Sequence, residues 1–175
     1  MRVVILHESP GADDLARGFL EAAEAFNRGL DFRLRFLDVG FSFRTVPVSS
    51  SGDVPAVLLD GTLRRFEPAV VLVLGRGLAL LECAAAAAKH AAPLAYFADK
   101  PADRTSEALA RFARILLSRP PFDGLPPDAT AEALPPGSPP GEALVKLLVR
   151  TVRGPRRHAS GPAPADTRPP DGDLP

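Results

Sequence analysis

Short apolar runs alternate with amphipathic stretches through the first two thirds of the chain. The runs that predict β-strands are Arg2–Leu6, Asp31–Val39, Ala69–Leu74, Pro93–Phe97 and Arg114–Ser118. The stretches with helical spacing of apolar residues are Ala12–Asn27, Val54–Phe66, Leu78–His90 and Ser106–Ala113. Strands that alternate with helices pair in parallel through right-handed crossovers. The pattern therefore predicts an α/β fold, with a single Rossmann-like open parallel sheet and helices on both faces.

The remaining segments complete the predicted organisation. Gly40–Asp53 is interrupted by Ser, Gly and Pro and predicts a loop, whereas Ala129–Leu134 predicts a short edge strand. Gly141–Arg153 has the pattern of an amphipathic helix. From residue 154 the chain is too rich in Pro, Gly, Arg and Asp to bury a core. We expect one domain over residues 1–153, followed by a disordered Pro/Arg-rich tail over residues 154–175.

Composition and charge narrow the classes of function. The 175 residues carry 21 basic and 21 acidic side chains, so net charge gives no argument for nucleic-acid binding. The single cysteine, Cys83, excludes an internal disulfide and disfavours a zinc site. No apolar run approaches the roughly 18 residues of a membrane helix, and the N-terminus lacks the apolar region of a signal peptide. The sequence predicts a cytoplasmic protein that binds neither nucleic acid nor membrane and holds no metal or cofactor.

Three loops follow the predicted strands at the edge where open parallel sheets bind ligands: His7–Ala12, Gly75–Gly77 and Ala98–Thr105. The turn Gly75-Arg76-Gly77 leads from the most apolar strand into a helix. Its glycines allow close approach, the helix N-terminus attracts anions, and Arg76 can contact a phosphate. No complete dinucleotide-binding or P-loop motif is present. We expect an anionic ligand at Gly75, Arg76 and Gly77, with a plain tight turn as the alternative.

Four side chains in the other two loops are candidate catalytic groups: His7, Glu8, Asp99 and Asp103. His7 and Glu8 offer a base and an acid after the first strand, although the sequence places no second carboxylate to orient His7. A solvated loop is the alternative there. Asp99 and Asp103 could bind sugar hydroxyls or cap the following helix, and capping is the favoured interpretation.

Four stretches follow the motif order of one known family. Phe66–Gly75 is similar to a KPDxVLVHGD strand, and Ala92–Phe97 to an IPVAHVEAG strand. Asp103–Ser118 is similar to the helix and strand that come next in that family. Glu132–Leu147 is similar to the segment that connects the family's first domain to its second. In these features the chain resembles the N-terminal domain of the non-hydrolysing UDP-N-acetylglucosamine 2-epimerases. The resemblance implies one Rossmann-like half of a glycosyltransferase-B type fold that acts on nucleotide sugars.

Most of the acidic residues of that family are absent. Arg76 stands where the family has an acid after the glycine, and Ala98 where it has a glutamate, with Asp99 beside it. A glutamate pair of the family falls on Ala102 and Asp103. Arginine cannot serve as a general base. The resemblance therefore implies a diverged domain that is inactive alone. It would bind a nucleotide sugar or another anionic small molecule, with a separate C-terminal-domain partner or as a homo-oligomer.

Two hypotheses from other classes remain open. One is a flavodoxin-like regulatory or protein-interaction module unrelated to sugar nucleotides. A receiver-type regulator needs an acidic cluster after the first strand and an aspartate after the third, where this chain has Glu8 alone and Gly75-Arg76. The other is a small enzyme that uses His7 and Glu8, for which the sequence provides no complete acid–base pair.

Overall fold

The computed structural model describes residues 1–30, 40–49, 56–90, 92–100, 103–119 and 127–153. The strands of this part are β1 (Arg2–Ser9), β2 (Ser42–Ser49), β3 (Val70–Leu74), β4 (Leu94–Ala98), β5 (Ala113–Ser118) and β6 (Thr130–Ala133). The helices are α1 (Asp13–Gly29), α3 (Ala56–Phe66), α4 (Leu78–Ala87), α5 (Arg104–Phe112) and α6 (Pro140–Arg153). The predicted tail, residues 154–175, lies outside the described residues.

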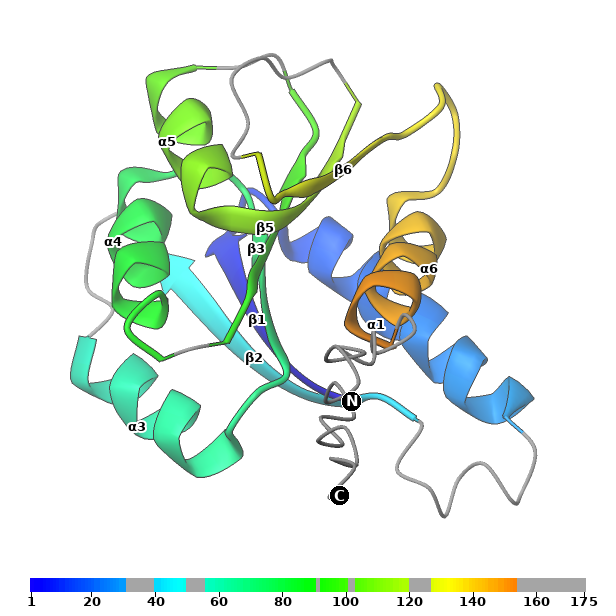
Figure 1. Ribbon diagram of the computed structural model, residues 1–175, viewed down its shortest axis with the longest axis horizontal. Helices are drawn as coiled ribbons and strands as arrows, with labels where there is room; N and C mark the ends of the chain where they lie inside the picture. Colours follow the sequence, from blue (N-terminus) through cyan, green and yellow to red (C-terminus); the bar gives the residue numbers. More distant parts are fainter. Residues whose placement is uncertain (31–39, 50–55, 91, 101–102, 120–126, 154–175) are drawn as a thin grey trace, which may run out of the picture.

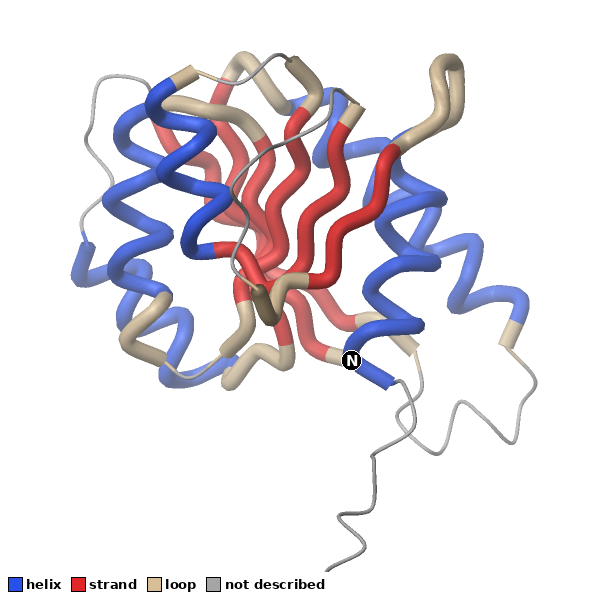
Figure 2. The backbone as a smooth tube through the Cα atoms, turned by 45° about the horizontal axis from the view of Figure 1, so that its top comes forward, coloured by secondary structure: helices blue, strands red, loops and turns tan. Residues whose placement is uncertain are grey.

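The strands form one six-stranded sheet in the order β2-β1-β3-β4-β5-β6. Every neighbouring pair is parallel. Helices α1 and α6 cover one face, and α3, α4 and α5 cover the other (Figures 1 and 2). This arrangement confirms the predicted α/β fold with an open parallel sheet between two helical layers.

The central strand β3 contributes to the core on both sides of the sheet. All five of its residues are buried, as expected for a parallel strand that is covered on both faces. Val70, Leu72 and Leu74 belong to the core beneath α1 and α6, whereas Val71 and Val73 belong to the core beneath α3, α4 and α5. The continuous apolar run in the sequence thus corresponds to two separate apolar layers.

The predicted loop over Gly40–Asp53 is wrong, because this segment contains β2. The whole strand pairs with β1, from Arg2 opposite Ser42 to Ser9 opposite Ser49. As an edge strand, β2 tolerates both the exposed polar residues and the missing N–H of Pro47, which would be unfavourable in the middle of a sheet. The strand predicted at Asp31–Val39 lies outside the described residues.

Helices α1 and α6 pack closely where two glycines meet. A Cβ atom added to Gly141 would lie 2.3 Å from the carbonyl oxygen of Gly18, which is closer than real Cβ atoms approach. The absence of a side chain at Gly141 therefore permits this helix contact. This contact places α6 over the same face of the sheet as α1.

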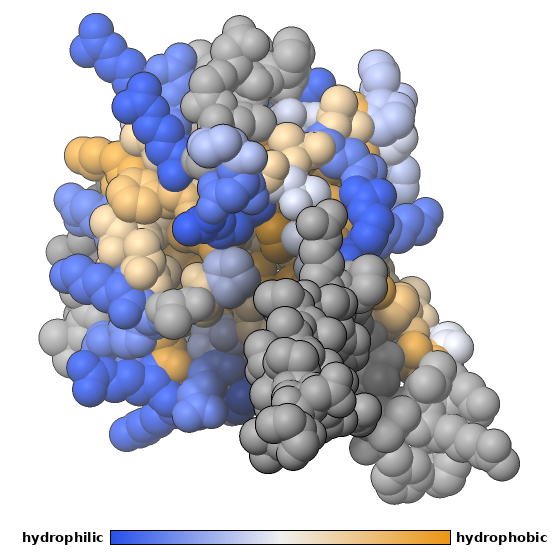
Figure 3. All heavy atoms as spheres, viewed as in Figure 1, coloured by the Kyte–Doolittle hydropathy of each residue, from blue (hydrophilic) through white to orange (hydrophobic). Residues whose placement is uncertain are grey.

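The face drawn in Figure 3 is mainly hydrophilic, with apolar side chains visible between the charged ones. Among the described residues, the large hydrophobic side chains that are exposed are Leu78 and Phe112. None of the described helices is long and apolar enough to cross a membrane.

Candidate functional site

The sheet changes winding direction between β1 and β3. From β1 the chain moves outward to β2 and then returns to the other side of β1 to form β3. Accordingly α1, which follows β1, and α4, which follows β3, pack on opposite faces of the sheet. The loops after β1 and β3 therefore diverge and leave a crevice at their carboxyl ends, which is where open α/β sheets bind ligands.

A cavity of about 240 Å³ lies at this switch point. Its polar lining comes from all three loops predicted to meet there, from β4 and from α5: Glu8, Arg76, Tyr96, Asp99, Lys100 and Ser106. Gly75 also lines the cavity, so the structure brings four of the predicted site residues, Glu8, Gly75, Arg76 and Asp99, to one place. The other three, His7, Gly77 and Asp103, lie next to this group rather than in the lining.

The Glu8 carboxylate lies against the turn that was expected to bind an anion. The backbone N–H of Arg76 donates a hydrogen bond to Glu8 Oε2 at 3.1 Å. Gly75 has φ +113°, a conformation that favours glycine, and an added Cβ would lie 2.7 Å from Glu8 Cβ. An added Cβ on Gly77 would lie 3.0 Å from Glu8 Oε1. The two glycines therefore make room for the glutamate side chain at the N-terminus of α4.

The Arg76 guanidinium contacts Asp103 across the crevice, with Nη1 3.3 Å from Oδ2. Asp103 is the N-cap of α5: the Ser106 N–H donates to Asp103 Oδ1 at 2.8 Å, and the Asp103 N–H donates to Ser106 Oγ at 2.7 Å. The hydrogen bond from the Ser106 backbone, helped by Arg76, holds the pKa of Asp103 below its usual range. The capping interpretation is confirmed for Asp103, which is ionised and fixed in place.

Asp99 does not cap α5, so that part of the capping interpretation is wrong. Its Oδ1 instead accepts a hydrogen bond from Arg119 Nε at 2.6 Å. The Arg119 N–H in turn donates to the carbonyl of Ala98 at 3.0 Å, so this pair joins the carboxyl ends of β4 and β5. Sequence reasoning missed Arg119 because its position opposite Asp99 depends on the register of two strands.

His7 has a carboxylate beside it, contrary to the sequence interpretation. Its Nδ1 lies 3.1 Å from Asp13 Oδ1, although these two atoms are not aligned for a hydrogen bond. The Ser9 hydroxyl donates to the other oxygen, Oδ2, at 3.3 Å. The carboxylate therefore stands between the serine and the histidine. A nucleophilic serine needs the imidazole beside its hydroxyl, so this arrangement does not form a catalytic triad.

Tyr96 is a crevice residue that the sequence analysis did not single out. It is buried on β4 and lines the cavity with its polar end near α5. Burial raises the pKa of its phenol, and the negative charge of Asp103 raises it further, so the group is neutral near pH 7. The sequence feature that points to Tyr96 is a tyrosine near the end of an otherwise apolar strand, because its hydroxyl can reach the carboxyl edge of the sheet.

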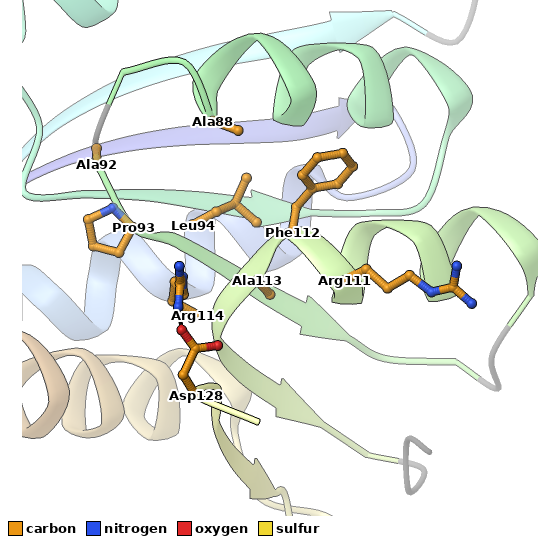
Figure 4. A pocket seen from close by; sticks show the side chains of 9 residues that line it. All are labelled: Ala88, Ala92, Pro93, Leu94, Arg111, Phe112, Ala113, Arg114 and Asp128. Carbon is orange, nitrogen blue, oxygen red and sulfur yellow. Dashed lines mark ion pairs between the residues drawn. The ribbon is translucent and has the colours of Figure 1, made fainter. Parts of the chain in front are cut away.

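A second cavity, of about 430 Å³, lies near the amino ends of β4 and β5, at the opposite edge of the sheet (Figure 4). Its apolar wall includes Leu94 and Phe112, and an ion pair joins Arg114 to Asp128 across it. It contains none of the residues predicted to act in a site. The carboxyl-edge crevice is therefore the better candidate, because it combines the switch point with convergent polar groups.

No cluster of three or more potential metal ligands occurs within the described ranges. No protein family and no curated protein sequence matches this chain. The resemblance to the epimerases therefore stays a prediction.

Proposed function

We propose that this chain is a non-catalytic binding subunit whose carboxyl-edge crevice takes the anionic part of a small molecule related to nucleotide sugars. The observation that carries the proposal is the convergence of Arg76 and Lys100 on one cavity at the switch point of the sheet. Cationic side chains beside a helix N-terminus favour phosphate groups.

The ion pair between Arg76 and Asp103 leaves Arg76 available to a ligand. The two side chains are 45% and 44% exposed, so solvent screens the pair and little free energy holds it together. A phosphate oxygen that enters the crevice can therefore compete with Asp103 for the guanidinium. The weakness of this ion pair supports binding of an anion without a large rearrangement of the fold.

The size of the cavity supports a subunit that works with a partner. Small-molecule sites usually enclose about 300–1,000 Å³, and they bury most of a ligand's surface. At about 240 Å³, the crevice has room for a phosphate group or a single ring rather than a whole nucleotide sugar. The rest of such a ligand would need a surface from a separate C-terminal-domain partner or from a second copy of this chain.

The carboxylates around the crevice support binding rather than catalysis. Asp103 caps a helix and has a lowered pKa, Asp99 is paired with Arg119, and Glu8 lies on the Gly75–Gly77 turn. A general acid or base needs a pKa near the working pH and a free path to the reacting atom. All three carboxylates already contact other groups of the chain, and the lowered pKa of Asp103 removes it further from this role.

The purified chain is accordingly expected not to interconvert UDP-N-acetylglucosamine and its manno epimer. The family that this chain resembles has a carboxylate at two positions where this chain has Arg76 and Ala98. The anomeric proton signals, followed by NMR, should match those of a heat-inactivated control. Turnover above that control would contradict a non-catalytic role.

Binding is tested by calorimetric titration of UDP into the wild type and Arg76→Ala. A charge-assisted contact contributes about 1.5–3 kcal/mol, so Arg76→Ala should weaken UDP binding roughly 10- to 150-fold. Arg65→Ala is the matched control, because Arg65 is an exposed arginine in the last turn of α3. Equal affinity in wild type and Arg76→Ala, or binding of neutral sugars alone, would contradict the proposed site.

One observation favours the second candidate, a flavodoxin-like regulatory or interaction module. The order β2-β1-β3-β4-β5 is the strand order of flavodoxin-like folds, with β6 added at the edge. The same titration separates the candidates, because an interaction module that is unrelated to sugar nucleotides would not bind UDP.

A further inference from the structure

We infer that Glu8 acts as an internal substitute for a ligand's anion at the Gly75–Gly77 turn and so determines which anions the crevice accepts. The inference rests on the proposed function, since it concerns selectivity within that same crevice. It assigns Glu8 a binding role that differs from the catalytic one considered from the sequence.

The Glu8 carboxylate lies against the turn at the N-terminus of α4. Oε2 accepts the backbone N–H of Arg76 at 3.1 Å, and Oε1 lies 3.0 Å from the place of a Cβ on Gly77. Both oxygens therefore contact the turn that precedes α4. A phosphate at a strand–turn–helix junction is bound by the same kind of backbone N–H group and is favoured by the same helix dipole.

Glycines in two loops leave room for the Glu8 side chain. Gly75 has φ +113°, and a side chain there would meet Glu8 Cβ at 2.7 Å and Oε2 at 2.9 Å. Gly11, in the loop after β1, would also contact Glu8 through an added Cβ, at 3.7 Å. Three glycines thus surround one glutamate side chain, and the backbone of Glu8 is fixed by its place in β1 opposite Val48.

The negative charge of Glu8 opposes a second anion on the turn. The Arg76 guanidinium extends to Asp103, so its side chain does not neutralise Glu8 directly. An anion placed on the turn would lie within a few ångströms of the Glu8 carboxylate and be repelled by it. A small anion such as inorganic phosphate gains too few contacts to offset this repulsion. A nucleoside diphosphate carries two phosphate groups, so one can lie on the turn while the other contacts Arg76 or Lys100, which line the same cavity.

The selectivity is tested by titrating inorganic phosphate and UDP separately into the wild type, Glu8→Gln and Glu8→Ala. Glu8→Gln removes the charge and keeps the shape of the side chain, whereas Glu8→Ala also vacates the turn. We expect both variants to bind phosphate at least 10-fold more tightly than the wild type, with a smaller gain for UDP. Glu24→Gln is the control for charge, because Glu24 is an exposed glutamate in the second half of α1.

Once thermal melts show that the variants fold, the titrations test both the inference about Glu8 and the proposed function. A gain in phosphate affinity in the Glu8 variants, absent from Glu24→Gln, supports the inference. Binding of UDP by the wild type with equal or weaker anion binding in the Glu8 variants overturns the inference and leaves the proposed function standing. Failure of every protein to bind either anion overturns both.

Discussion

Replacing Gly75 with alanine should lower the free energy of unfolding by about 2–6 kcal/mol. The residue has φ +113°, and holding an alanine in such a backbone region costs about 1–3 kcal/mol. The new Cβ would also lie 2.7 Å from Glu8 Cβ and 3.0 Å from Leu80 Cδ1, and overpacking of this kind costs about another 1–3 kcal/mol. Urea denaturation, followed by circular dichroism, measures the loss.

Gly61→Ala is the matched control for this substitution. Gly61 lies within α3, and an added Cβ would meet nothing within 4 Å. Alanine is favoured over glycine inside a helix, so this variant should gain about 0.5–1 kcal/mol. A Gly75→Ala protein as stable as the wild type would show that the turn does not enclose Glu8 as described. The close contact between the turn and Glu8 would then no longer support the inference that Glu8 occupies an anion's place.

The main features of the fold follow from sequence patterns because burial imposes them. A strand covered on both faces must be apolar throughout, and β3 is recognisable for that reason. The edge strand β2 is different, since Val48 is its only fully buried residue and polar residues and Pro47 are tolerated beside it. Its sequence therefore has the composition of a loop, and its pairing with β1 had no local signal.

The location of the candidate site was predictable, but its internal pairing was not. Parallel strands end at one edge, so the loops after β1, β3 and β4 had to meet there. Which side chains touch depends on strand register and turn shape. Arg119 reaches Asp99 through the alignment of β5 with β4, and His7 meets Asp13 because the chain folds back between β1 and α1. Neither contact has a signature in sequence spacing.

The contacts of the Glu8 side chain could not be predicted from the sequence either. The glycines at positions 75 and 77 predict that the backbone can approach a ligand closely. They do not indicate that the group at the turn is a side chain of the protein itself, because that depends on the direction of Glu8 at the end of β1. In this structure the carboxylate at the turn before α4 belongs to the chain itself.

Replacing Leu148 with alanine should cost about 2–5 kcal/mol of unfolding free energy, toward the upper end of that range. Leu148 is fully buried in the core that α6 forms with α1 and the sheet. The cost of a large-to-small substitution grows with the cavity that remains, and it is lowest where neighbouring elements can move inward. Here α6 cannot approach α1 further, because the backbones already meet at Gly141 and Gly18. The cavity should therefore stay largely open.

Lys146→Ala is the control in the same helix, since Lys146 is 80% exposed and forms a long ion pair with Glu142, at 3.9 Å. That variant should lie within about 0.5 kcal/mol of the wild type, as surface substitutions usually do. Urea denaturation of both variants decides the point. Unchanged stability in Leu148→Ala would mean that α6 does not cover the sheet in solution. The helix would then either be solvated or use Leu144 and Leu147, which are buried with Leu148, for a contact with another chain.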